Sequence, residues 1–508
     1  MFSRSSGILM HISSLPGPYG IGSMGKEARH FVDFLQRGGQ SYWQLLPLVW
    51  PGEWNSPYMS PSSAAGNPMF IDLEALAEAG LLTWDEVNAQ RYNGSPDRAA
   101  FDFLHVTRLP LLRQAFQRAD EALLERVRAF AREHSDWLPD FALFMALNDY
   151  FGCGLQDWPD KKLLRRDEKT VAKYAQQLAQ DVLFYQFLQY LFFQQWSALK
   201  AYANEKGVSI IGDVPIYVSG NSADVWVHPE LFRVTAARRP KYVAGVPADL
   251  FNDQGQFWGF PLYNWKYHQE TGFAWWCNRI RQSMAFYDVI RIDHFRGFYD
   301  YWEIPATAES ALEGKWRKGP GMKIIEAFRK NLPDAVFIAE DLGDLSEGAV
   351  RFIQEAGLPG MRVLTDAFSA LDGTSGFLPH QGTPDSVMYT GTHDTPTFVQ
   401  WYNDMATPEQ RNYCTNYLHI HMDEGVGWCA IAGAWISPCR LAMAPLQDVL
   451  CLGADARMNF PGTTDGANWS WRVRAEALND TIADRLHYVT FLYGRLPAKR
   501  ETGEEKKQ

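Results

Sequence analysis

The chain of 508 residues is long enough to bury a large hydrophobic core without disulfides or other cross-links. Apolar residues make up 46% and charged residues 21% of the sequence, a balance that excludes disorder as the main state. The net charge of −11 argues against a nucleic acid as partner, because binding to a phosphate backbone requires a surplus of Lys and Arg.

The sequence predicts a cytoplasmic protein with no membrane partner. Its first residues, MFSRSSGILMHISSLPGP, carry a charge but no apolar run long enough for a secretory signal. The most apolar stretch, residues 183–196, is interrupted by four glutamines and is too short to cross a bilayer. The six cysteines form no CxxC pair and show no metal-ligand spacing, so we expect reduced core residues rather than a disulfide framework.

Short apolar runs rich in β-forming residues alternate with helical stretches along the chain, a pattern typical of parallel α/β folds. The candidate strands are residues 7–12, 42–48, 208–214, 289–293, 335–340, 361–364, 387–390 and 446–450. Several are continuously hydrophobic, as expected for strands buried on both faces. Eight such runs predict a single catalytic (β/α)8 barrel over residues 1–508, with large, mostly helical insertions between its strands.

The uneven spacing of the strands predicts where these insertions lie. Residues 64–207 follow the second strand and show mainly helical periodicity. Residues 219–285 follow the third strand and are rich in Gly, Pro and aromatic residues, so we expect a loop or lid there. The tail, residues 498–508, is charged and poor in apolar residues, and we expect it to be disordered.

A glycine-rich segment at residues 20–25, GIGSMG, matches the GxGxxG dinucleotide fingerprint. Seven residues, including Pro16 and Pro18, separate it from the preceding strand, where a Rossmann turn is tight. The next strand also lacks the acidic residue that would hold a ribose hydroxyl. We therefore do not expect a nucleotide site here.

The strongest chemical signal is the segment VIRIDHFR at residues 289–296. Side chains alternate along a strand, so Arg291 and Asp293 share one face while Ile290 and Ile292 share the other. Burial of the isoleucines against helices directs Arg291 and Asp293 into the mouth of the barrel. We expect the guanidinium to lower the pKa of Asp293 and keep it ionised, as a nucleophile requires. A purely structural salt bridge is the alternative.

Two further strands end in titratable groups. In AVFIAEDLG, residues 335–343, Glu340 shares a face with Ile338 and lies where the strand ends. In YTGTHDTP, residues 389–396, another β-rich run leads to His393 and Asp394. Catalytic groups of (β/α)8 barrels lie at the carboxyl ends of the strands, so three acidic strand ends predict an active site.

Together with Asp213 in IGDVP, residues 211–215, these segments resemble the four signature regions of the α-amylase clan. More specifically, the chain resembles the amylomaltase family of 4-α-glucanotransferases. The resemblance is carried along nearly the whole chain by SGIL (6–9), SLPGPYGIG (14–22), SPY (56–58), AGNP (65–68), AGVP (244–247), GQFWG (255–259), RMN (457–459), PG (461–462) and NW (468–469). It also implies that the glycine-rich segment is a substrate-side loop.

The resemblance implies a retaining transfer of α-1,4-glucan segments between maltooligosaccharides or to glucose, with no metal and no organic cofactor. Asp293 would attack the anomeric carbon while Glu340 protonates the departing oxygen and then activates the acceptor. Asp394 completes the implied catalytic set, and with His393 it would hold the ring hydroxyls of the donor sugar.

The resemblance also implies a substrate-binding set. Its members are Tyr58, Asp213, Asp249, Trp258, Arg291, Asp341, His393, Asn459 and Pro461. Within this set, Tyr58 and Trp258 would supply stacking faces for sugar rings. The implied partners are maltooligosaccharides, amylose or starch-type glucans and glucose as acceptor, bound by a monomer or a weak homo-oligomer.

Two other functions compete with glucan transfer. A net α-1,4-glucan hydrolase would use the same acids with water as acceptor. A catalytically silent glucan-binding protein is the other alternative, but the intact set of Asp293, Glu340 and Asp394 argues against it. Only the products formed from a pure oligosaccharide separate the hydrolase from the transferase.

Overall fold

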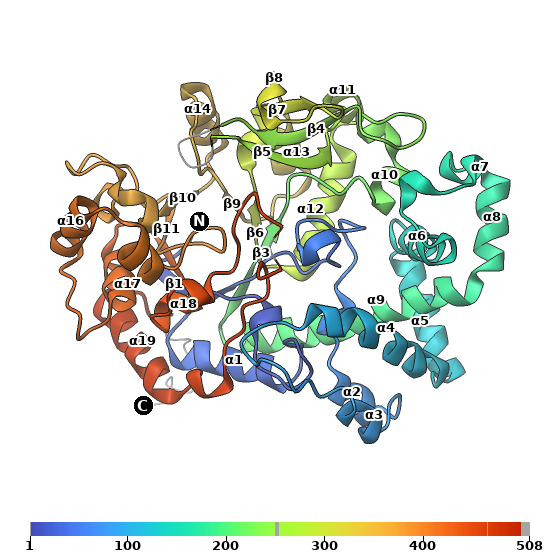
Figure 1. Cartoon of the computed structure of the whole chain (residues 1–508), viewed down its shortest axis with the longest axis horizontal. Coiled ribbons are helices and arrows are strands. Elements are labelled where there is room, and N and C mark those ends of the chain that lie inside the picture. Colours follow the sequence, from blue (N-terminus) through green and yellow to red (C-terminus); the bar gives the residue numbers. More distant parts are fainter. Residues whose placement is uncertain (1, 249–252, 465, 499–508) are drawn as a thin grey trace, which may run out of the picture.

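The computed structural model describes residues 2–248, 253–464 and 466–498. At its centre lies a closed barrel of parallel strands in the order β1-β12-β11-β10-β9-β6-β3-β2 (Figure 1). The strands are β1 (Ser5–Leu9), β2 (Tyr42–Gln44), β3 (Ser209–Val214), β6 (Val289–Ile292), β9 (Phe337–Ala339), β10 (Gly360–Val363), β11 (Ser386–Tyr389) and β12 (Leu441–Pro445). The predicted (β/α)8 fold class is confirmed.

Seven barrel strands overlap the runs predicted from the sequence, but the prediction of the eighth was wrong. Residues 446–450 do not form a strand; they begin with the short helix α18 (Leu446–Val449), and the strand is β12, immediately before it. Apolar residues occur on both sides of this boundary, so hydrophobicity does not show where the strand ends. Pro445 marks the end of the strand, because it has no N–H for the strand ladder and its fixed φ suits the start of a helix.

The barrel interior explains why polar groups gather at one end. Its inward-facing apolar side chains are Ile211, Val289, Ile338, Met361, Val363, Val387, Tyr389, Leu441 and Met443. Ile290 and Ile292 pack instead in the outer core, as their alternation predicts. Two residues beyond Ile211, Val289 and Ile338, the inward positions are Asp213, Arg291 and Glu340. The apolar filling is thus replaced by charged groups at the carboxyl end of the barrel.

The chain between β2 and β3 is largely helical, and it extends to the right of the barrel in Figure 1. Its helices are α2 (Leu73–Glu78), α3 (Trp84–Asn88), α4 (Phe101–Gln117), α5 (Glu121–Glu133), α6 (Leu138–Phe151), α7 (Lys161–Leu164), α8 (Glu168–Gln177) and α9 (Ala179–Glu205). The long helix α9 packs against α5 and α6 and also against β3, so it joins the helical insertion to the barrel wall.

Residues 219–285 are more regular than the loop expected from the sequence. They contain α10 (Ala223–Val227), β4 (Tyr242–Val246), β5 (Gln256–Pro261), α11 (Trp265–Glu270) and α12 (Ala274–Phe286). β4 and β5 join β7 (Asp300–Pro305) and β8 (Lys315–Lys318) in an antiparallel sheet of order β5-β4-β7-β8, at the top of Figure 1. β7 follows β6 in the chain, and local sequence patterns do not show such a long-range pairing.

The remaining helices complete the outer layer of the barrel. They are α1 (Lys26–Arg37), α13 (Met322–Asn331), α14 (Glu347–Ala356), α15 (Phe398–Gln400), α16 (Pro408–Leu418), α17 (Val426–Ile436) and α19 (Asp480–Leu492). None of the helices in the described residues is long and apolar enough to cross a membrane. All six cysteines lie in the described part of the chain and are unpaired. Of the predicted disordered tail, residues 499–508 lie outside the described residues.

Candidate active site

Side chains from several strand ends meet at the carboxyl end of the barrel. They are Asp213 on β3, Arg291 and Asp293 at the end of β6, Glu340 directly after β9, His393 and Asp394 in the loop after β11, and Tyr58 in the loop after β2. The sequence placed Arg291, Asp293, Glu340, His393 and Asp394 at strand ends, and the resemblance added Asp213 and Tyr58. Strand alternation directs Arg291, Asp293 and Glu340 into one site.

Arg291 is the central cation of this site and is only 2% exposed. The register of β3 and β6 places Asp213 opposite Arg291. A single nitrogen, Nη1, donates hydrogen bonds to Asp213 Oδ2 at 2.6 Å and to Asp293 Oδ1 at 3.1 Å. The positive charge of Arg291 is therefore divided between two carboxylates, and the shorter contact is the one to Asp213.

The expectation that Arg291 lowers the pKa of Asp293 was wrong in its net direction. Burial raises the pKa of Asp293, and this effect outweighs the attraction of Arg291. The nearby charges of Asp213, Glu340 and Asp394 raise it further. The sequence showed one cation beside one carboxylate, but the folded barrel gathers four carboxylates around that cation.

Glu340 accepts a hydrogen bond at each carboxylate oxygen from the backbone. The N–H of His294 donates to Oε2 and the N–H of Leu342 donates to Oε1, both at 2.7 Å. Burial raises the pKa of Glu340, while Arg291 and the two N–H donors oppose this rise. Glu340 and Asp293 are thus two partly buried carboxyl groups that both hold a proton more strongly than fully exposed ones do.

A second ionic pair forms across the site from Asp293. Nε2 of His393 lies 3.1 Å from Oδ2 of Asp394, and the side-chain amide of Asn459 donates to Oδ1 of Asp394 at 2.7 Å. Burial opposes the charge on Asp394, but His393 and Asn459 outweigh it and lower its pKa. Burial likewise opposes the charge on His393, but Asp394 raises its pKa overall. Each member of the pair therefore favours the charged form of the other.

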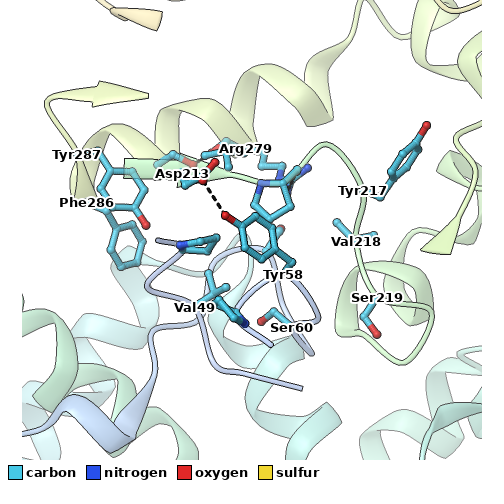
Figure 2. A pocket seen from close by; sticks show the side chains of 16 residues that line it. Val49, Tyr58, Ser60, Asp213, Tyr217, Val218, Ser219, Arg279, Phe286 and Tyr287 are labelled. Atoms are coloured by element: carbon cyan, nitrogen blue, oxygen red, sulfur yellow. Dashed lines mark hydrogen bonds between the residues drawn. The ribbon is translucent and has the colours of Figure 1, made fainter. Parts of the chain in front are cut away.

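Tyr58 connects this pair to Asp213. Its hydroxyl donates to Asp213 Oδ2 at 2.8 Å and lies 2.7 Å from Nε2 of His393, and its ring stacks on the imidazole. Figure 2 shows Tyr58 reaching Asp213 across the cavity beside β3. Other residues lining this cavity include Val49, Ser60, Tyr217, Val218, Ser219, Arg279, Phe286 and Tyr287. Asp213 Oδ1 has no hydrogen-bond partner among the described residues.

The remaining candidate residues lie at different distances from this cluster. Trp258 on β5 is half-buried, and its ring meets that of His294 edge to face, with centroids 5.0 Å apart. Asp341 accepts the Met361 N–H at 2.6 Å, so it faces β10 rather than the cluster. Pro461 is exposed in the turn after Asn459. Asp249 lies outside the described residues.

Three residues of the site were given no role by sequence reasoning. Trp469 packs against Tyr58 and His393, with ring centroids 5.6 Å and 6.1 Å apart. Arg457 donates to the backbone carbonyl of Asp394 at 3.1 Å. His294 holds Glu340 through its backbone N–H. A contact made by a backbone N–H does not depend on the type of residue, so the sequence does not reveal it. The only signal for His294 is that it directly follows Asp293.

The described residues contain no group of three or more His, Cys, Asp or Glu side chains arranged to hold a metal ion. What the site does contain is a pair of partly buried carboxyl groups at the ends of neighbouring strands, beside an ionic pair and an aromatic ring. Such a pair of carboxyl groups can serve as nucleophile and proton donor.

Known proteins resemble this chain over nearly its whole length. The sequence profile of the 4-α-glucanotransferase family matches residues 10–478. The 4-α-glucanotransferase of Clostridium butyricum is 40% identical over 96% of this chain and all of its own, and that of Thermus thermophilus is 42% identical over 97% and 99%. The amylomaltase of Streptococcus agalactiae, solved with acarbose, superposes with a TM-score of 0.94 at 40% identity over 97% of this chain and all of its own. The chain therefore belongs to the 4-α-glucanotransferase family and is an enzyme that transfers glucans.

Proposed function

We propose that Asp293 is the nucleophile and Glu340 the acid/base of a retaining double displacement. A carboxylate oxygen of Asp293 attacks the anomeric carbon of the donor glucan, and the glycosidic C–O bond breaks. Glu340 gives its proton to the departing oxygen and becomes a carboxylate. In the second step Glu340 takes the proton of an acceptor hydroxyl, whose oxygen displaces Asp293 from the anomeric carbon.

The observation that carries this assignment is the pairing of Asp293 and Glu340. The register of β6 and β9 joins Ile292 to Ala339, so Asp293 and Glu340 are the next residues on adjacent strands. Adjacent strands lie about 4.8 Å apart, and retaining enzymes place their two carboxyl groups about 5–5.5 Å apart. The raised pKa values of both groups favour the form with one shared proton, which the first step requires.

Asp394 and His393 supply a second part of the mechanism. They are held by each other and by Asn459, and Asp394 lies close enough to Asp293 to affect its pKa. We assign them to the hydroxyls of the donor sugar, where fixed charges stabilise the positive charge that develops at the anomeric centre. The ring of Tyr58 supplies an apolar face for the same sugar.

The substrates that fit this site are α-1,4-linked maltooligosaccharides and longer starch-type glucans, with glucose or a glucan end as acceptor. The structural relative solved with acarbose supports a glucan-like ligand. Net hydrolysis by the same acids is the competing reaction, because water needs no binding site of its own. Transfer requires that an acceptor sugar at millimolar concentration outcompete water, a discrimination of about 10⁴-fold or about 5.5 kcal/mol in barrier height.

Incubation of the purified enzyme with maltotriose alone tests this substrate assignment. Transfer predicts glucose together with a ladder of oligosaccharides longer than maltotriose, because each cleaved segment is joined to another chain. Chromatography that shows only maltose and glucose, with reducing ends rising in proportion, would instead identify a hydrolase.

A further inference from the structure

His294, the residue after Asp293, has an unusual backbone conformation. Its φ of 48° and ψ of 49° lie in the left-handed region, which is uncommon for residues other than glycine, although asparagine, aspartate and histidine adopt it more often than the rest. This conformation allows the N–H of His294 to donate to Glu340 Oε2 at 2.7 Å while the chain turns into the short 3-10 helix Phe295–Phe298. Strained backbone of this kind persists only where surrounding contacts impose it, and it is frequent at active sites.

The ring of His294 is held by the sheet that lies over the barrel. Trp258, on β5, meets the imidazole at an interplanar angle of 89° with centroids 5.0 Å apart. Trp258 also donates its indole N–H to Gln256 Oε1 at 3.0 Å, which fixes the orientation of the indole. One residue is therefore connected on its backbone side to Glu340 and on its ring side to β5.

We propose that His294 is a positioning residue for Glu340: its left-handed backbone directs an N–H at the acid/base group, and the backbone conformation rather than the imidazole ring carries this role. The inference rests on the proposed role of Glu340. The hydrogen bond from the His294 N–H to Glu340 is strongest when Glu340 is a carboxylate. This is the state formed as the leaving group departs. The contact therefore assists the step in which the proton leaves Glu340.

The His294 ring could in principle act on Glu340 through its charge, and the groups around Glu340 show that it does not at neutral pH. The charged or titratable groups that face Glu340 are Arg291 and Asp293 on β6, Asp341 in its own loop and His294 itself. Burial, with a smaller effect of Arg296, lowers the pKa of His294 to about 4, so its ring is neutral above pH 5. Replacing the ring consequently removes no charge from the site at neutral pH.

Substitutions that differ in their tolerance of left-handed backbone test the proposal. In His294→Val the β-branched side chain disfavours this conformation, so the N–H turns away from Glu340. Loss of a donor to the carboxylate raises the pKa of Glu340, and the alkaline limb of kcat/KM moves to higher pH. We expect kcat to fall about tenfold or more with maltotriose. With α-glucosyl fluoride, whose fluoride leaves without a proton, the loss in the first step is much smaller.

His294→Gly and His294→Asn remove the ring but accept the left-handed conformation, so both variants keep the alkaline limb near its wild-type position. His419→Val is the matched control. His419 has nearly the same backbone angles, φ 51° and ψ 51°, but it is exposed at the end of α16. The His419→Val variant measures the loss of thermal stability that a β-branched residue causes at a left-handed position. We expect its pH profile to remain that of the wild type.

Two outcomes overturn the proposal. One is a folded His294→Val variant whose alkaline limb does not move; the other is an equal shift in the Val, Asn and Gly variants, which would assign the effect to the ring. If His294→Val does not fold, His294→Ala makes the same comparison against Gly. Glu340→Gln is measured in parallel: equal losses on both donors in that variant would remove the acid/base assignment itself, independently of His294.

Discussion

One nitrogen of Arg291 serves two carboxylates, and this division of charge sets the chemistry of single residues in the site. The contact to Asp213 is shorter than the contact to Asp293, so Asp293 receives the smaller share of the positive charge. Burial and three neighbouring carboxylates then raise the pKa of Asp293. In the mechanism that we propose, the active form carries one proton on the Asp293–Glu340 pair.

The pH profile of kcat/KM tests this arrangement. The proposed mechanism needs Asp293 ionised and Glu340 protonated, and both pKa values are raised, so both limbs of the bell lie above the usual carboxyl range of about 4. In Asp213→Asn the negative charge that raises the pKa of Asp293 is lost, so the acid limb moves to lower pH. An acid limb that stays in place or moves upward would contradict the assigned division of charge.

At the scale of elements, alternation and strand ends explain most of what the sequence predicted correctly. Arg291, Asp293 and Glu340 were placed at the barrel mouth because period-two alternation is local information, whereas Asp213 was implied only by the family resemblance. The boundary between β12 and α18 was missed because apolar residues continue across Pro445. The pairing of β4 with β7 was missed because it joins segments separated by β6.

The role of Asp448 follows only from the correct boundary between β12 and α18. In the predicted strand it would be an unexplained acid, but in α18 it is fully buried and accepts the Thr390 hydroxyl at 2.6 Å and the Phe398 N–H at 2.8 Å. It therefore connects the end of β11 to the start of α15. Burial raises its pKa to about 6, despite both hydrogen bonds.

This pKa makes the stability of the fold depend on pH. The pKa of this carboxyl group is higher in the folded than in the unfolded protein. Its contribution to the stability of the fold is therefore complete below the pKa of the unfolded state, near 4, and is lost as the pH rises through about 6. When the pH is raised from 4.5 to 7, we expect the free energy of unfolding of Asp448→Asn to increase by about 2 kcal/mol relative to that of the wild type. Denaturant unfolding at the two pH values measures the difference; a constant offset would mean that Asp448 does not titrate in this range.

The β4–β5 hairpin is the element that we propose as a lid. Trp258 points toward His294 from β5, and its neighbour Phe257, which is 44% exposed, lies on the opposite face of the strand. We expect Trp258→Ala to raise the ratio of hydrolysis to transfer, because water gains access to the glucosyl-enzyme. Phe257→Ala is the matched control and leaves the ratio unchanged. Equal loss of both activities in Trp258→Ala, with the ratio preserved, would make the hairpin a packing or binding surface only.

At the scale of the whole molecule, the site draws on almost the entire chain. Tyr58 lies in the loop after β2 and Asn459 follows α18, about 400 residues later, yet His393 and Asp394 connect them. Sequence patterns identify the strand ends but not the loops that meet above them, because loop positions depend on the packing of insertions. Hence the contacts of Arg457, Trp469 and the His294 N–H were found only in the folded structure.

The central claim is that Asp293 forms a glucosyl-enzyme while Glu340 moves the proton. The most direct test is mass spectrometry of Glu340→Gln quenched after reaction with α-glucosyl fluoride. This donor needs no acid to react, but the variant lacks the base that activates the acceptor, so the intermediate accumulates. The mechanism predicts one added glucosyl group on the peptide that contains Asp293. An adduct on any other residue, or no adduct together with equal activity losses on the fluoride and on maltotriose, would contradict it.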